Sequence, residues 1–149
     1  MIKKEFLSKT KQSGQSLVEF AISLTMILIL LTGAVEISLA LFEYVTMRDA
    51  AQEGALYGSI NPTNETGIKN RVIAAASDVL ALAPGDITVS YSNSAKKCEG
   101  LTNNAPNSLT VTVVHQHQLV MPLIGTFLGR QQIGMSANVT DTILTPTCH

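Results

Sequence analysis

Glu19 is the first residue whose type and position point to chemistry. It stands at the start of a long apolar run, five residues after Gly14 and directly before Phe20. A carboxylate beside hydrocarbon is costly unless it is paired, so an acid in this place is a candidate functional group. The simpler alternative is that Glu19 lies among lipid headgroups, where an acid costs little.

Two histidines form a second candidate group. His115 and His117 lie two residues apart on an expected strand, so their side chains share one face and two metal ligands could converge there. A third ligand is missing. His149 or a cysteine would complete the set only if the C-terminal tail folded back. We expect a plain strand face, without a metal or cofactor.

The sequence lacks the motifs of the common enzyme classes. No serine stands in a nucleophile elbow, and there is neither a phosphate-binding loop nor a dinucleotide-binding glycine pattern. Charged residues make up 14% of the 149 residues and the net charge is −1, so a broad basic surface for nucleic acid is absent. We therefore expect neither catalysis nor nucleic-acid binding.

A membrane-spanning helix is expected behind Glu19. From Phe20 to Phe42 the only charged residue is Glu36, and a helix of this length extends about 34 Å, enough to cross the hydrocarbon core. A secretory signal peptide is the alternative, but its apolar region is shorter, about 7–15 residues. Four lysines precede the run against one acid: Lys3, Lys4, Lys9 and Lys11, with Glu5. They favour a cytoplasmic N-terminus and an extracytoplasmic chain after about Tyr44.

The run GQSLVEF, from Gly14 to Phe20, resembles the prepilin signature of a glycine, four residues, then Glu followed by Phe or Tyr. It is most similar to TadE-like pseudopilins of tight-adherence pili. The resemblance implies that a prepilin peptidase cuts between Gly14 and Gln15, at a bond that glycine leaves least obstructed. It also implies that Glu19 pairs with the new terminal amine of a neighbouring subunit, which helps to fix the axial register. For Glu36 we favour the outer interface, with pairing between subunits as the alternative.

The helix is expected to continue as a stem to about Ser59. Small residues recur on one face and permit close approach of another backbone: Ala51, Gly54, Ala55 and Gly58. The neighbour is either another subunit's stem or this chain's own head, and the sequence leaves both open. The segment from Arg48 to Ala55 also resembles the Ala-Arg-Glu-Gly-Ala box of TadE-like proteins. Gln52 stands where Arg is common, which weakens any role for a cation there.

Residues 60–149 are expected to form an exported α+β head. A turn at residues 61–64 precedes a helix with an apolar stripe from Ile68 to Leu82, which stops at Pro84-Gly85. Alternating residues at 87–92 and 109–113, and a third run at 133–139, predict a three-stranded antiparallel sheet covered by this helix. The apolar bridge 119–124 is too short to span a membrane. It covers the head's own core or meets another subunit or the membrane surface.

Cys98 and Cys148 are the only cysteines. In an oxidising space outside the cell membrane a disulfide is favoured over a thiol nucleophile. A Cys98–Cys148 disulfide would close a loop of roughly fifty residues and would stabilise the head by about 4 kcal/mol in the chain-entropy model.

The expected organisation is a basic leader at 1–14, removed on processing, a membrane helix and stem at 15–59, and the head at 60–149. The expected function is that of a pseudopilin, more specifically a minor pilin, with four kinds of partner: the membrane, the prepilin peptidase, other pilin and pseudopilin subunits, and the pilus assembly platform. The alternative is an uncleaved single-pass membrane protein with an extracytoplasmic binding head, in which Glu19 is incidental.

Overall fold

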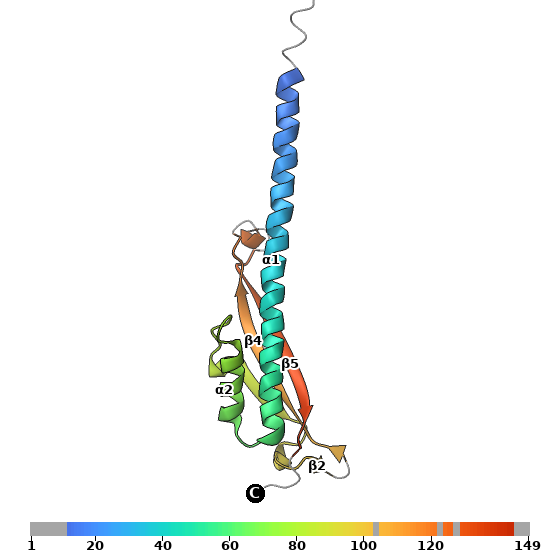
Figure 1. The fold of residues 1–149 in the computed structure, drawn as a ribbon, viewed down its shortest axis with the longest axis vertical. Helices are drawn as coiled ribbons and strands as arrows, with labels where there is room; N and C mark the ends of the chain where they lie inside the picture. The colour runs from blue at the N-terminus through green and yellow to red at the C-terminus, as the bar shows by residue number, and fades with distance from the viewer. Residues whose placement is uncertain (1–11, 103–104, 122–123, 127–128, 145–149) are drawn as a thin grey trace, which may run out of the picture. The chain divides into compact units, whose positions relative to one another are not determined.

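The computed structural model describes residues 12–102, 105–121, 124–126 and 129–144 (Figure 1). Residues 1–11 of the expected leader lie outside this range. The chain divides into two compact units, one up to Ser38 and one from Leu39 onward.

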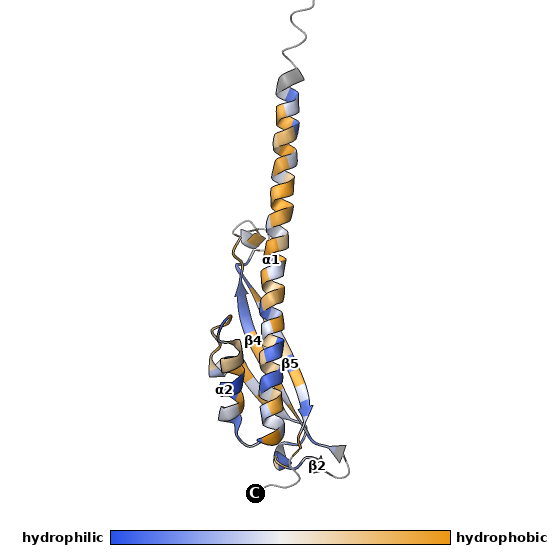
Figure 2. Ribbon diagram, viewed as in Figure 1, coloured by the Kyte–Doolittle hydropathy of each residue, from blue (hydrophilic) through white to orange (hydrophobic). Residues whose placement is uncertain are grey.

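Helix α1 runs from Gln12 to Ile60. No proline interrupts it, and the first one in the chain, Pro62, comes two residues after its end. Its N-terminal half is coloured as strongly apolar in Figure 2. Several of its hydroxyl groups bond back to the helix, as the Thr25 hydroxyl does to the Ala21 carbonyl at 2.8 Å, so these add no unpaired polar group. By length and composition α1 can cross a membrane, which agrees with the expected span.

Helix α2 runs from Glu65 to Ala76, and the Asn64 side chain caps it by accepting a hydrogen bond from the Gly67 amide at 2.9 Å. The expectation that the helix continues to Pro84 is wrong. Ser77 and Asp78 follow Ala76, and both residue types compete with helical hydrogen bonding through their side chains. Leu80 and Leu82 are still buried, but from the turn and the extended chain that follow the helix.

Three strands form the main antiparallel sheet, in the order β1-β4-β5: β1 at Ile87–Tyr91, β4 at Ser108–Gln118 and β5 at Gln132–Thr142. Val111 on β4 pairs with Val89 on β1 and with Val139 on β5. A two-stranded hairpin, β2 at Leu101–Thr102 and β3 at Ala105–Pro106, forms a second sheet. Two short 3-10 turns, η1 at Pro84–Asp86 and η2 at Ser94–Lys96, complete the elements. The expected α+β class with a three-stranded antiparallel sheet is confirmed.

The core of the second unit lies between one face of this sheet and helices α1 and α2 (Figure 1). The alternate residues Leu109, Val111 and Val113 of β4 are fully buried on that face. The small-residue side of α1 packs there too. A Cβ atom added at Gly58 would lie 2.8 Å from Leu109 Cδ2, and one at Gly54 would collide with Val72 of α2. The close neighbour that the sequence left open is therefore this chain's own head.

Candidate functional site

The residues of the expected processing signature all lie in the first turns of α1. Gly14 is exposed, and a Cβ atom added to it would meet no other atom within 4 Å. Glycine lowers helix stability by about 1 kcal/mol relative to alanine, so the backbone opens more easily here than in the apolar run behind it. The Gly14–Gln15 bond is thus accessible and lies in a locally weak part of the helix.

Glu19 lies one helical turn after Gln15, on the same side of α1. The Gln15 side-chain amide donates a hydrogen bond to the Glu19 carboxylate over 3.4 Å, and both side chains are exposed. This distance lies beyond the usual range for N–H···O bonds. Within the described residues no cation lies within ion-pair distance of Glu19. Its carboxylate therefore has room for a stronger partner.

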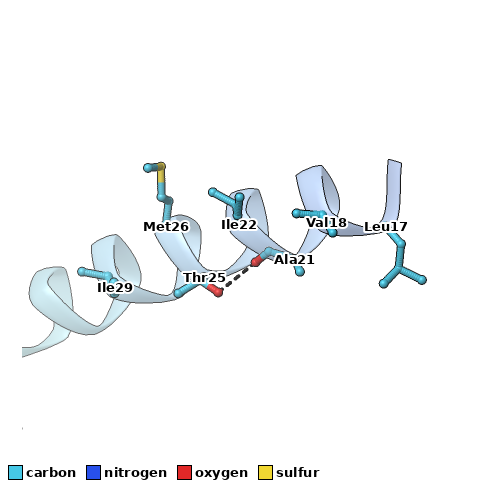
Figure 3. Close-up of a pocket in the computed structure, with 7 residues that line it drawn as sticks. All are labelled: Leu17, Val18, Ala21, Ile22, Thr25, Met26 and Ile29. Carbon is cyan, nitrogen blue, oxygen red and sulfur yellow. Dashed lines mark hydrogen bonds between the residues drawn. The ribbon is translucent and has the colours of Figure 1, made fainter. Parts of the chain in front are cut away.

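The helix face that follows is apolar and offers no convergent polar groups. Figure 3 shows its side chains, with the Thr25 hydroxyl turned back onto the Ala21 carbonyl. Phe20 is 67% exposed, beside this face. Exposed apolar side chains along several turns are what a membrane-embedded helix requires, because lipid replaces the missing protein neighbours. The face resembles a lipid contact and not a catalytic pocket.

Glu36 behaves differently from Glu19. It is 4% exposed, whereas its neighbours Val35 and Ile37 are 54% and 70% exposed. Such strong burial was not predicted for this acid, which the sequence favoured at the outer interface.

A contact that was not predicted from the sequence joins Glu43 on α1 to the two histidines of β4. The Glu43 Oε2 atom lies 2.9 Å from His117 Nδ1 and 3.6 Å from His115 Nε2. His117 is 2% exposed and Glu43 is 24% exposed, so much of the cluster is shielded from water. His115 and His117 do face the same way, as the strand alternation predicts. The partner they face is the Glu43 carboxylate.

A signal for this partner was present in the sequence. Glu43 lies four residues before Met47, which is fully buried, so both belong to one helix face. Tyr44, the residue after Glu43, is 41% exposed and lies outside that face. Among the described residues, no group of three His, Cys, Asp or Glu side chains is arranged to hold a metal ion. His149 lies outside the described range.

Cys98 is half-buried in the segment after η2. Asn107, 1% exposed, organises this segment: its amide donates to the Lys96 carbonyl at 2.7 Å and its oxygen accepts from the Asn93 amide at 3.1 Å. Cys148 lies outside the described residues, so the Cys98–Cys148 disulfide stays a prediction.

Tyr91, at the end of β1, holds the turn between the two helices. Its hydroxyl donates to the Pro62 carbonyl at 2.6 Å. Burial, together with the negative charge of Glu65, raises the pKa of Tyr91 to about 12. Lys97 forms an ion pair with Glu65 at 3.1 Å and lies 4.8 Å from the centre of the Tyr91 ring. These contacts tie α2, β1 and the segment of Cys98 together.

Residues 14–56 match the TadE-like protein family. The match begins at the glycine of the processing signature and covers α1 as far as Leu56, which confirms the resemblance found in the sequence over this segment. No curated protein matches the chain, and no solved structure does.

Proposed function

With the TadE-like segment as the premise, we propose that this chain is a pseudopilin, more specifically a minor pilin, of a tight-adherence pilus. It is inserted as a single-pass membrane protein with its N-terminus in the cytoplasm and its α+β head outside. The observation that carries the proposal is the family match at residues 14–56, which begins at Gly14. The long apolar helix behind Gly14 supports it.

A prepilin peptidase is the first proposed partner, and it cuts between Gly14 and Gln15. Two features of Gly14 favour this cut: it is exposed, and no neighbouring atom crowds it. A protease must bind an extended backbone, and a glycine near a helix end yields one at low cost. Cleavage leaves the amine of Gln15 as a positive charge at the start of α1.

The neighbouring pilin or pseudopilin subunit is the second proposed partner, with Glu19 as the contact. Among the described residues, the one group that bonds to the Glu19 carboxylate is the Gln15 side chain, through the long hydrogen bond. The new amine of another subunit offers a full positive charge, and charge-assisted hydrogen bonds are roughly twice as strong as neutral ones. A membrane environment strengthens the attraction further, while the cost of desolvation opposes it. The pilus assembly platform is the proposed site at which subunits meet.

Replacing Glu19 by Gln tests the assembly role and separates it from the alternative of an uncleaved membrane anchor. In cells that carry the matching pilus system, Glu19→Gln should reach wild-type membrane levels and still lose its leader, yet fail to support pili seen by electron microscopy. Glu53→Gln is a matched control, because Glu53 is an exposed acid on the same helix and should support normal piliation. Normal piliation with Glu19→Gln would favour the anchor.

A further inference from the structure

Within the unit that starts at Leu39, strand β4 runs along α1 toward the apolar end of the helix. Leu109, near the start of β4, packs at Gly58, where an added Cβ would lie 2.8 Å from it. His117, near the end of β4, lies 2.9 Å from the Glu43 carboxylate. Glu43 follows directly on Phe42, the last residue of the apolar run. The end of β4 is thus level with the outer end of the expected membrane span.

The connection from β4 to β5 starts beside Glu43, where β4 ends, and its first residues are apolar. Leu119 and Met121 are half-buried, and Val120 between them is 69% exposed. Two apolar side chains of α1 in the same unit, Leu41 and Phe42, are 60% and 57% exposed. Large apolar side chains are therefore exposed both just after β4 and on α1 just before Glu43.

The charge of this connection is also distinctive. Residues 119–131 contain one charged side chain, Arg130, and no acid. Arg130 is exposed, and no acid of the described residues pairs with it. Gly129, with a φ of 68°, turns the backbone just before Arg130, and the Arg130 amide donates to the Gly125 carbonyl at 3.0 Å. The turn places a cation beside an apolar segment.

We propose that the end of the head at which β4 finishes rests on the outer surface of the phospholipid bilayer, with Val120 in the boundary between headgroups and acyl chains and Arg130 at the lipid phosphates. An exposed apolar residue next to a lone arginine fits this environment, since apolar side chains partition into the interface and arginine binds phosphate. The inference rests on the membrane insertion that the proposed function includes.

Tryptophan fluorescence can test this proposal directly, because the chain contains no tryptophan. The full-length variant Val120→Trp would be reconstituted in vesicles made of equal parts phosphatidylethanolamine and phosphatidylglycerol. The vesicles would contain lipids brominated either near the headgroup or deep in the acyl chain, and iodide would probe exposure to water. Leu144→Trp is the matched control: Leu144 is also 69% exposed, and its amide donates to the Ser59 carbonyl at the opposite end of the head. Leu30→Trp, at a residue 73% exposed within the apolar run, reports on insertion.

The proposal expects Val120→Trp to be quenched by the shallow bromine and shielded from iodide. Leu144→Trp should be quenched by iodide and not by the shallow bromine. Leu30→Trp should be quenched by the deep bromine. Adding Arg130→Gln to Val120→Trp should weaken the shallow quenching. If Val120→Trp is quenched only by iodide, or is shielded from both quenchers as in a contact with a second protein, the proposal is overturned while membrane insertion stands. If Leu30→Trp is not quenched by lipid, both the inference and the proposed insertion fail.

Discussion

The carboxylate of Glu43 on α1 lies 2.9 Å from Nδ1 of His117 on β4, across 74 residues of sequence. The contact fixes how far β4 advances along the helix. His115, two residues earlier on the strand, turns its Nε2 atom toward the same carboxylate oxygen at 3.6 Å. This cluster therefore ties the end of β4 to α1 at Glu43.

Replacing Glu43 by Ala should destabilise the head by about 1–3 kcal/mol, because the buried His117 then loses a hydrogen-bond partner. The free energy of unfolding of the full chain in detergent, measured by guanidinium titration, checks this. Glu53→Ala, at an exposed acid on the same helix, should change it by no more than about 0.5 kcal/mol. Equal effects of the two substitutions would show that the Glu43–His117 contact contributes nothing specific.

Replacing Gly58 by Ala should also destabilise the head, by about 1–3 kcal/mol, since the added Cβ would press on Leu109 and Ile68. Helix propensity alone predicts a gain of up to about 1 kcal/mol for the same change. Gly85→Ala serves as the control, because a Cβ at Gly85 would meet no atom within 4 Å. A Gly58→Ala variant as stable as wild type in thermal unfolding would contradict the close packing of α1 on β4.

Two patterns in the sequence made much of this fold predictable. The unbroken apolar run predicts α1, and the alternation of Leu109, Val111 and Val113 predicts β4 with its buried face. The length of α2 was not predictable from its apolar stripe, because Leu80 and Leu82 are buried from non-helical chain. An apolar stripe predicts which residues are buried, but it does not by itself predict that the backbone between them is helical.

Long-range contacts were the part of the site that the sequence could not supply. Glycines such as Gly54 and Gly58 suit any close neighbour, and only the position of Val72 and Leu109 identifies it as the chain's own head. The pairing of Glu43 with His117 likewise depends on how β4 lies against α1. Gly14 and Glu19, in contrast, were recognisable from spacing alone, since their signature is local.

Stability should fall at alkaline pH through Tyr91. Its pKa is about 12 in the folded protein against an ordinary 10.0, because burial and the charge of Glu65 disfavour the phenolate. The neutral phenol is thus favoured in the folded state, and its contribution is complete below pH 10 and lost as the pH rises from about 10 to about 12. Tyr91→Phe should show a smaller decline than wild type in unfolding titrations over this range. Tyr44→Phe, at an exposed tyrosine, should decline as wild type does, and an unchanged decline in Tyr91→Phe would refute this assignment.

The Cys98–Cys148 disulfide should form in protein isolated from the extracytoplasmic side. Alkylation followed by mass spectrometry should modify neither cysteine before reduction and both after it. Cys98→Ser and Cys148→Ser should each cost about 4 kcal/mol of head stability in the chain-entropy model, and the double variant should cost no more than either single one. Rapid alkylation of the unreduced native protein would exclude the bond.

The mass of the mature N-terminus tests the central claim most directly. When the chain is expressed with the prepilin peptidase of its own pilus system, intact-mass analysis and N-terminal sequencing should show a chain that begins at Gln15. Gly14→Val should remain uncut, whereas Gly33→Val should be cut normally. A Cβ at either glycine would meet no atom within 4 Å, so neither change should disturb the fold. A mature chain that still begins before Gln15, or a Gly14→Val variant cut like wild type, would contradict the account.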